Sequence, residues 1–313
     1  MIYDVIIIGG GPSALSAGLY LGRYRKKTLL VTDSFGGLAL NAGEIENYPG
    51  YTKIAGFELI QKMIEQIKSL EDIEIREGET VTSVIKNRGG FTIKTDSKEY
   101  QSLCVLICAG SKPRTLGFKG EDKLIGRGLS YCATCDSLLA KAKKVIVIGG
   151  GRSATEAAIT LTNIASKVTI VNINKKLSGE KITLDKLELS KSVNIINNAE
   201  TTGFILDNNF IKGIKYKDKN NNKTREISGS MVFVEIGQVP NTDNFKNIVK
   251  VNEKGEIKIN QKTNETSVRG IYSSGDITDI KFKQIIIAAG EGAKAAMSIN
   301  QYLGNNLARL NAK

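Results

Sequence analysis

Histidine and tryptophan are absent from the 313 residues, and proline and cysteine each occur only four times. The missing histidine excludes Ser-His-Asp triads, Cys-His proteases and imidazole metal sites, and we expect no metal centre. No apolar run reaches the roughly 18 residues of a membrane span. The apolar start, 1–21, is broken by Asp4 and by Gly9-Gly10-Gly11-Pro12, and it lacks the basic beginning of a signal peptide. We therefore expect a cytoplasmic protein without membrane contact.

Positive charge exceeds negative charge, with 44 Lys and Arg against 32 Asp and Glu, a net +12. Such an excess favours acidic partners, either acidic proteins or nucleotides. Aromatic residues make up only 6% of the chain, and no run of five or six like charges occurs. The composition therefore argues against nucleic acid as a partner.

Two segments of the chain have nearly the same pattern, which predicts a repeated fold. Ile-Ile-Ile-Gly-Gly-Gly-Pro-Ser-Ala at 6–14 recurs as Ile-Val-Ile-Gly-Gly-Gly-Arg-Ser-Ala at 146–154. Each copy follows a β-branched run, opens an apolar-periodic helix and is closed by another β-branched run. The expected strand, helix and strand are 3–8, 12–23 and 28–32 in the first copy, and 145–148, 152–164 and 168–171 in the second.

Each Gly-rich segment has the spacing G-x-G-x-x-A of a dinucleotide-binding turn. The first glycine forms the tight turn, the second lets a diphosphate approach the backbone, and the small third residue lets helix and strand pack closely. These positions are Gly9, Gly11 and Ala14 in the first copy and Gly149, Gly151 and Ala154 in the second. Two such copies predict an α/β protein with two Rossmann-like (βαβ) nucleotide-binding domains.

The remaining apolar patterns complete the expected secondary structure. We expect several strands within 80–109, strands at 211–216 and 231–236, an exposed hairpin turn at 217–224, and a long helix at 284–303 followed by ten frayed residues.

The four cysteines fall into two pairs with different spacing. Cys104 and Cys108 lie four apart on an expected strand, about 13 Å between their Cα atoms. A disulfide requires at most about 7 Å, so these two are expected to be unpaired, buried residues.

Cys132-Ala133-Thr134-Cys135 has the spacing of a redox dithiol at a helix start, where the helix dipole lowers a thiol pKa. Zinc would need four ligands, which the chain does not offer. Asp136 follows directly and is the candidate proton donor or acceptor of this pair; a helix-capping role for its carboxylate is compatible with this.

Together these segments resemble the low-molecular-weight thioredoxin reductases over nearly the whole chain. The motifs that carry the resemblance are Gly9-Gly10-Gly11-Pro12-Ser13-Ala14, Gly36-Gly37, Glu44-Ile45-Glu46-Asn47-Tyr48-Pro49-Gly50, Cys132-Ala133-Thr134-Cys135-Asp136, Gly149-Gly150-Gly151, Gly237-Gln238-Val239-Pro240-Asn241, Gly275-Asp276-Ile277-Thr278-Asp279 and Lys283-Gln284.

The resemblance implies an FAD-binding domain at 1–114 plus 242–313, with an NAD(P)-type domain that carries the dithiol, 115–241, inserted into it. Asn47 would lie near the flavin ring, and Asp276 and Gln284 near the ribityl and diphosphate groups. The residues expected to bind FAD are Gly9, Gly11, Pro12, Ser13, Ala14, Asp33, Gly36, Gly37, Asn47, Ala109, Gly110, Asp276, Lys283, Gln284 and Ile285. Cys135 would face the flavin, Cys132 would attack the disulfide of thioredoxin or a thioredoxin-like protein, and the protein would be a homodimer.

The chain departs from the family pattern at the second nucleotide site. NADPH-using relatives carry a His-Arg-Arg cluster there, whose guanidinium groups suit a 2′-phosphate, whereas this chain has Asn172, Ile173 and Asn174, with Ser178 further on. An NAD site would prefer an acidic residue at the strand end. We therefore expect a vestigial nucleotide site made of Gly149, Gly151, Arg152, Ser153 and Ala154. At the flavin, Leu38 replaces the usual glutamine.

These departures resemble the ferredoxin-dependent flavin thioredoxin reductases, which implies reduced ferredoxin as electron donor. A plant-type ferredoxin near −400 mV can reduce a thioredoxin near −270 mV, with ~130 mV or ~6 kcal/mol to spare for two electrons. The insert 115–241 has 19 Lys and Arg against 12 Asp and Glu, and the rest has 25 against 20. The denser positive charge of the insert suits an acidic protein.

We therefore predict a flavin-dependent thioredoxin reductase with ferredoxin as donor. The alternatives are an NAD(P)H-dependent reductase with weak nucleotide affinity, a flavoenzyme that reduces a small molecule such as a quinone, and a non-enzymatic redox-responsive flavin-binding protein.

Overall fold

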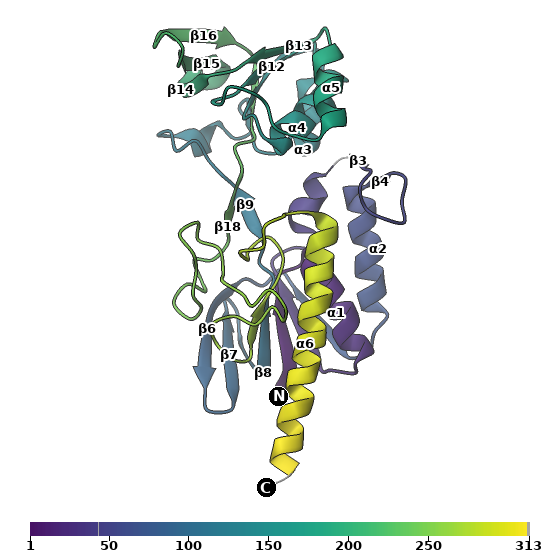
Figure 1. The fold of residues 1–313 in the computed structure, drawn as a ribbon. Helices are drawn as coiled ribbons and strands as arrows, with labels where there is room; N and C mark the ends of the chain where they lie inside the picture. Colours follow the sequence, from purple (N-terminus) through teal and green to yellow (C-terminus); the bar gives the residue numbers. More distant parts are fainter. Residues whose placement is uncertain (43, 312–313) are drawn as a thin grey trace. The chain divides into compact units, whose positions relative to one another are not determined.

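The computed structural model describes residues 1–42 and 44–311, which divide into two compact units (Figure 1). Unit 1 comprises Met1–Lys112 and Val239–Lys313, and unit 2 comprises Pro113–Gln238. Unit 2 is therefore inserted into the sequence of unit 1. The short strands β9 (Ser111–Pro113) and β18 (Gln238–Pro240), where the chain passes between the units, pair with each other.

A mostly parallel sheet forms the centre of unit 1. Its order is β5-β2-β1-β8-β7-β6, and β19 pairs with β8 in parallel. The strands are β1 (Ile2–Ile8), β2 (Thr28–Thr32), β5 (Ile73–Glu77), β6 (Val81–Asn87), β7 (Gly90–Thr95), β8 (Glu99–Ile107) and β19 (Ile271–Ser273). Strands β1, β2, β5, β8 and β19 run parallel, while β6 and β7 form an antiparallel extension. All parallel strands therefore end at one edge of the sheet.

Three helices pack on one face of this sheet: α1 (Pro12–Arg23), α2 (Gly56–Lys68) and α6 (Ile285–Asn311). Figure 1 shows α6, in yellow, running beside α1. The close packing requires Gly292 of α6, since a Cβ there would overlap the carbonyl oxygen of Ser13. Phe245, Val249 and Ile257 cover the other face. Shorter elements of unit 1 are η1 (Gly37–Asn41), β3 (Glu44–Ile45) and β4 (Ile54–Ala55).

Unit 2 repeats the βαβ arrangement with five parallel strands in the order β10-β17-β11-β12-β13. They are β10 (Leu129–Ser130), β11 (Lys144–Ile148), β12 (Lys167–Val171), β13 (Val193–Ile196) and β17 (Met231–Val234). Its helices are α3 (Ala133–Asp136), α4 (Arg152–Thr162), α5 (Lys181–Leu189), η2 (Glu121–Leu124) and η3 (Ser137–Ala140). An antiparallel sheet of β14 (Ala199–Asp207), β15 (Phe210–Asp218) and β16 (Thr224–Ser228) packs on the opposite face.

The predicted α/β class with two Rossmann-like folds is confirmed, and most of the predicted elements lie within two residues of their observed bounds. The hairpin turn predicted at 217–224 is observed between the end of β15 at Asp218 and the start of β16 at Thr224. The predicted end of the last helix, at Leu303, is wrong, because α6 continues to Asn311. Leucine and alanine in 304–311 favour a helix and outweigh the neighbouring Gly and Asn residues. Within the described residues, no helix is long and apolar enough to cross a membrane.

The contact between α1 and α6 predicts a stability difference between two glycines of one helix. Gly292→Ala is expected to lower the free energy of unfolding by about 1–3 kcal/mol, because its Cβ would overlap the backbone at Ser13. Gly290→Ala is the matched control: no atom lies within 4 Å of its Cβ position, so alanine should stabilise the helix by up to about 1 kcal/mol. Urea unfolding followed by circular dichroism measures both, and equal stabilities would contradict the packing.

Candidate functional site

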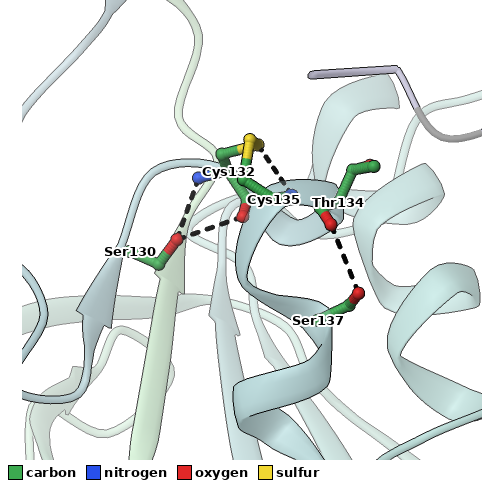
Figure 2. Close-up of a disulfide and its surroundings, with 5 residues drawn as sticks. All are labelled: Ser130, Cys132, Thr134, Cys135 and Ser137. Carbon is green, nitrogen blue, oxygen red and sulfur yellow. Dashed lines mark hydrogen bonds between the residues drawn. A yellow bond between two sulfur atoms is a disulfide. The ribbon is translucent and has the colours of Figure 1, made fainter. Parts of the chain in front are cut away.

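The Cys-x-x-Cys segment forms a disulfide at the start of α3, as Figure 2 shows. The Cα atoms of Cys132 and Cys135 are 5.3 Å apart. Ser130 fixes the backbone of Cys132 before α3: its Oγ accepts from the Cys132 N–H at 3.0 Å and donates to the Cys132 carbonyl at 3.1 Å. The Cys135 N–H donates to Cys132 Sγ at 3.0 Å. A donor directed at this sulfur stabilises the thiolate that reduction produces.

Exposure differs between the two sulfur-bearing residues and their neighbour. Cys135 is exposed, while Cys132 and Asp136 are half-buried. The Asp136 N–H donates to the Cys132 carbonyl at 3.2 Å, which closes the single turn of α3. The Asp136 carboxylate makes no capping hydrogen bond to η3. A capping role, the structural alternative considered for this residue, therefore has no support in the structure.

Cys104 and Cys108 are unpaired and buried, as their spacing predicted. Burial raises the pKa of the Cys104 thiol to about 12 and that of Cys108 to about 11. Cys108 Sγ lies 3.6 Å from Ser13 Oγ and 3.3 Å from Ser274 Oγ, and the two hydroxyls are 2.6 Å apart. Among the residues that the structure describes, no cluster of three or more His, Cys, Asp or Glu could hold a metal ion.

The first Gly-rich turn leaves space in front of α1. Gly9 has φ +115°, and a Cβ there would overlap the Cys108 carbonyl, so only glycine fits. Gly11 is the N-cap of α1 and has no atom within 4 Å of its Cβ position, and Pro12 occupies the first helical turn. The N–H groups of Ser13 and Ala14, in the first turn, have no partner within the helix. This open helix N-terminus fits a diphosphate.

Three further predicted segments lie at the same edge of the unit 1 sheet. The Gly36 N–H donates to the Gly10 carbonyl at 2.9 Å, which places Gly36 and Gly37 beside the first turn. Asp33 follows β2 directly, at the strand end where an acidic residue can accept a ribose hydroxyl. Ala109 and Gly110 follow β8. Their carbonyls accept from Asn241, at 2.8 Å from its side-chain amide and 3.0 Å from its N–H respectively.

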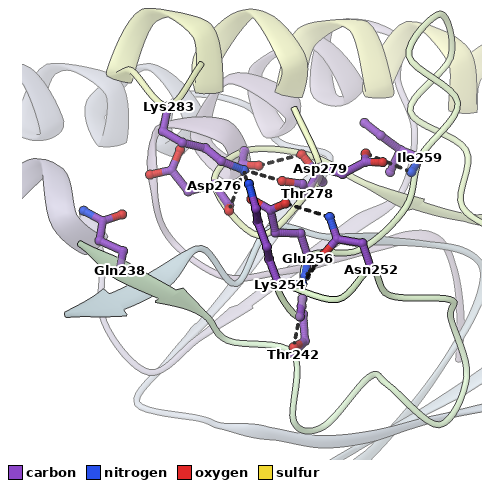
Figure 3. A network of polar contacts seen from close by, with 12 residues as sticks. Gln238, Thr242, Asn252, Lys254, Glu256, Ile259, Asp276, Thr278, Asp279 and Lys283 are labelled. Carbon is purple, nitrogen blue, oxygen red and sulfur yellow. Dashed lines mark hydrogen bonds and ion pairs between the residues drawn. The ribbon is translucent and has the colours of Figure 1, made fainter. Parts of the chain in front are cut away.

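Asp276 lies next to the N-terminus of α1, because a Cβ at Gly275 would be 3.0 Å from the Cβ of Ser13. Figure 3 shows the network around it. Lys283 Nζ donates to the carbonyl of Asp276 at 3.1 Å and to that of Thr278, and it forms an ion pair of 3.2 Å with Glu256. Burial raises the pKa of Glu256, but the hydrogen bond from Asn252 and the charge of Lys283 outweigh it and leave this pKa lowered.

Among the described residues, none donates a hydrogen bond to the Asp276 carboxylate. Burial raises the pKa of this carboxyl group. An acceptor in this state is suited to a ligand that carries hydroxyl groups, as the ribityl chain of FAD does. The residues present therefore fit FAD: an open helix N-terminus for its diphosphate and a free carboxylate beside it. Gln284 and Ile285 follow at the start of α6. Asn47 is exposed after β3, and no described contact joins it to this group.

Polar groups beside the second Gly-rich turn have hydrogen-bond partners within unit 2 itself. Gly149 has φ +139°, and Gly151 faces open space as Gly11 does. The Gly150 carbonyl, however, accepts from the Ser178 N–H at 2.7 Å and from its hydroxyl at 3.3 Å. Asn172 is fully buried and occupies the position that a Cβ on Gly150 would take. Its Oδ1 accepts from the Asn174 N–H at 3.0 Å, and its Nδ2 donates to Asn197 at 2.8 Å.

Arg152 begins α4 and is bound by two carboxylates. Its Nε donates to Glu156 at 2.6 Å, and its other guanidinium nitrogen lies 3.3 Å from Glu180. Ser153 and Ala154 follow in the first turn of α4, where Ala154 is fully buried. The Arg152 charge is thereby neutralised within unit 2 and is less available to a phosphate.

Glu235 is a residue that the sequence pattern did not mark, since 231–236 is expected as one strand. Strand β17 ends at Val234, and Glu235 follows it. The pKa of Glu235 is raised to about 7, chiefly by burial and also by the charge of Glu156, while the Ala133 backbone N–H lowers it. No sequence signal singles this residue out, because a single acid at the end of an apolar run is common.

Comparison with known proteins identifies relatives over almost the whole chain. Residues 3–294 match the pyridine nucleotide-disulphide oxidoreductase family. The thioredoxin reductase of Bacillus subtilis (strain 168) is 37% identical over 303 residues, 96% of this chain and 95% of the relative. The crystal structure of Lactococcus lactis thioredoxin reductase (FR conformation) superposes with a TM-score of 0.93 at 32% identity, covering 97% of this chain and 99% of that one.

Two further similarities bear on the identity of the partners. A ferredoxin-flavin thioredoxin reductase from Clostridium acetobutylicum is 31% identical, with a TM-score of 0.53 and coverage of 97% of this chain and 99% of that one. An alkyl hydroperoxide reductase component of Escherichia coli (strain K12) is 36% identical over 305 residues, 96% of this chain. This chain spans only 58% of that relative's length.

The open first turn predicts a change in flavin content. Gly11→Val is expected to lower FAD affinity at least about tenfold, because its side chain would occupy the space in front of α1 where the diphosphate approaches. The flavin released per protein on denaturation measures the effect. Gly151→Val, the same position of the second turn, is the control and should leave the flavin content unchanged. Loss of flavin in both variants, or in neither, would contradict the assignment of FAD to the first turn.

Proposed function

Because the chain belongs to the pyridine nucleotide-disulphide oxidoreductase family, we propose that it is a thioredoxin reductase that receives electrons from reduced ferredoxin. It is a flavoprotein disulfide oxidoreductase with FAD as cofactor. The observation that carries the proposal is the Cys132–Cys135 disulfide, which lies at an accessible helix start with a donor directed at one sulfur. FAD, when bound, supplies the electron pair that reduces this disulfide.

The cysteines act in turn on the substrate. Reduction of the Cys132–Cys135 disulfide by two electrons leaves a thiolate on Cys132, which the Cys135 N–H stabilises. This thiolate attacks the disulfide of thioredoxin and forms a mixed disulfide, releasing one substrate thiolate. Cys135 then attacks the Cys132 sulfur, which restores the internal disulfide and releases the second substrate thiolate. Two protons complete the two substrate thiols.

Asp136 is proposed as the group that moves a proton to and from these sulfurs. It follows Cys135 directly, it is half-buried, and its carboxylate has no capping hydrogen bond. The chain has no histidine to take this role. A carboxyl group in such a position can exchange protons with a thiol and with solvent.

The electron donor is proposed from the state of the second Gly-rich turn. NADPH requires donors for a 2′-phosphate and NADH requires an acceptor for a 2′-hydroxyl. Asn172, at the corresponding strand end, uses both its side-chain groups within unit 2, and Arg152 is bound by two carboxylates. The positive charge of the insert suits an acidic protein donor instead. We also propose a cytoplasmic homodimer.

Replacing one cysteine tests the reductase function. Cys135→Ser is expected to abolish NADPH- or ferredoxin-driven reduction of thioredoxin, because the internal disulfide can no longer form, while the protein stays folded and yellow. Cys104→Ser, a buried cysteine outside the dithiol, is the control and should retain turnover. Full activity of Cys135→Ser would disprove the dithiol mechanism, and turnover insensitive to alkylation would favour a flavoenzyme that reduces a small molecule. Absence of flux to any disulfide, with a redox-dependent partner, would favour a non-enzymatic flavin-binding protein.

An anaerobic mixing experiment tests the donor. The oxidised flavoprotein is mixed with reduced ferredoxin, NADPH or NADH, and the loss of flavin absorbance is followed by stopped flow. We expect rapid bleaching by ferredoxin and slow bleaching by both nucleotides, because Asn172 and Arg152 beside the second turn are already bound within unit 2. Rapid bleaching by micromolar NADPH would overturn the ferredoxin proposal and leave an NAD(P)H-dependent reductase.

A further inference from the structure

Glu235 and Cys132 of the redox disulfide follow the ends of two neighbouring strands of the unit 2 sheet. Strands β10 and β17 are neighbours and run parallel, with Ser130 paired to Phe233. Two residues further along each strand direction stand Cys132 and Glu235. Strand β11, on the other side of β17, ends at the second Gly-rich turn, and the Glu235 N–H donates to the Ile148 carbonyl at 2.8 Å. Glu235 therefore lies between the dithiol segment and the second Gly-rich turn.

The Glu235 carboxyl group is in contact with the dithiol segment. The N–H of Ala133, the buried residue that follows Cys132, is near enough to the Glu235 carboxyl group to lower its pKa. This contact joins the carboxyl group to the same turn that carries both sulfur atoms. Negative charge created on a sulfur is therefore felt by the carboxyl group across one peptide unit, in surroundings that exclude part of the water.

Within the described part of the chain, Glu156 is the charged side chain that acts on the pKa of Glu235. Glu156 of α4 faces it, and the charge of Glu156 is bound by Arg152. Arg152 is shared with Glu180, so it is not free to neutralise Glu235. On α3, Asp136 is the other acid near the disulfide. Burial and Glu156 bring the pKa of Glu235 to about 7, so its proton is exchangeable under physiological conditions.

We propose that Glu235 binds a proton when the Cys132–Cys135 disulfide is reduced and releases it when the disulfide re-forms. Two electrons from the reduced flavin and one proton break the S–S bond and give a thiol on Cys135 and a thiolate on Cys132. The new negative charge raises the proton affinity of Glu235, which takes a second proton from solvent. Reduction thus consumes two electrons and two protons while Cys132 remains a thiolate. The proton returns to solvent when the thiolate has transferred its electrons to the substrate disulfide.

This role rests on the proposed reductase function, but its test needs neither thioredoxin nor ferredoxin. The full-length flavoprotein is equilibrated with reduced and oxidised dithiothreitol between pH 6 and pH 9, and the disulfide fraction is scored by thiol alkylation and mass. Each proton taken up on reduction changes the equilibrium constant tenfold per pH unit. Above pH about 7, we expect the wild-type constant to change up to tenfold more per pH unit than that of Glu235→Gln.

Glu235→Gln keeps the shape of the side chain and an acceptor oxygen near Ala133, so a purely structural role of Glu235 would leave the proton count of reduction unchanged. Glu156→Gln is the matched control: it removes the neighbouring charge and should keep the wild-type steepness while moving it to lower pH. Infrared difference spectra, reduced minus oxidised, should show a protonated carboxyl band that is missing in Glu235→Gln. Equal steepness in wild type and Glu235→Gln, or an unchanged carboxyl band, would overturn the proposal. Failure of thioredoxin turnover with this proton coupling intact would instead count against the proposed substrate.

Discussion

The whole arrangement depends on two glycines held at backbone angles that other residues rarely adopt. Gly9 and Gly149 have φ of +115° and +139°, and each lies against the carbonyl of the neighbouring strand's end, at Cys108 and Glu235 respectively. Any side chain there would force the helix away from its strand. The turn delivers the N-termini of α1 and α4 to the strand edges, where the residues proposed to bind FAD lie in unit 1 and the dithiol segment lies in unit 2.

The two Gly-rich turns have similar backbone conformations but differ in which neighbouring polar groups remain available to a ligand. In unit 1, the space beyond Gly11 is open and Asp276 retains an unpaired carboxylate among the described residues. In unit 2, Asn172 and Ser178 satisfy polar groups from within, and Arg152 is held by carboxylates. A polar group that is already satisfied offers little to a ligand, because binding would first have to break its existing hydrogen bonds. In the proposed enzyme, one fold serves as the FAD site and the other carries the disulfide.

Much of the fold could be predicted from the sequence, because its strongest patterns are local. The bounds of α1, the paired glycine turns and the unpaired state of Cys104 and Cys108 follow from spacing within a few residues. The partners of Arg152 could not be predicted, since Glu180 is brought near by a loop. The burial of Glu235 and its proximity to Ala133 could not be predicted either. They arise because β10 and β17, which are about 100 residues apart in the sequence, are neighbours in the sheet. The predicted end of α6 at Leu303 is wrong, because the Leu and Ala residues beyond it favour a helix and α6 continues to Asn311.

Cys104 and Cys108 are buried thiols with raised pKa values, which makes them resistant to oxidation. Peroxides attack thiolates, and thiols whose pKa lies near 11 or 12 remain protonated inside the cell. Oxidising agents therefore find only the Cys132–Cys135 pair, whose oxidised product is a disulfide that the next electron pair repairs. Among the four cysteines, oxidant would therefore reach the pair that is restored by reduction, while the thiol of Cys108 beneath the first Gly-rich turn stays buried and protonated.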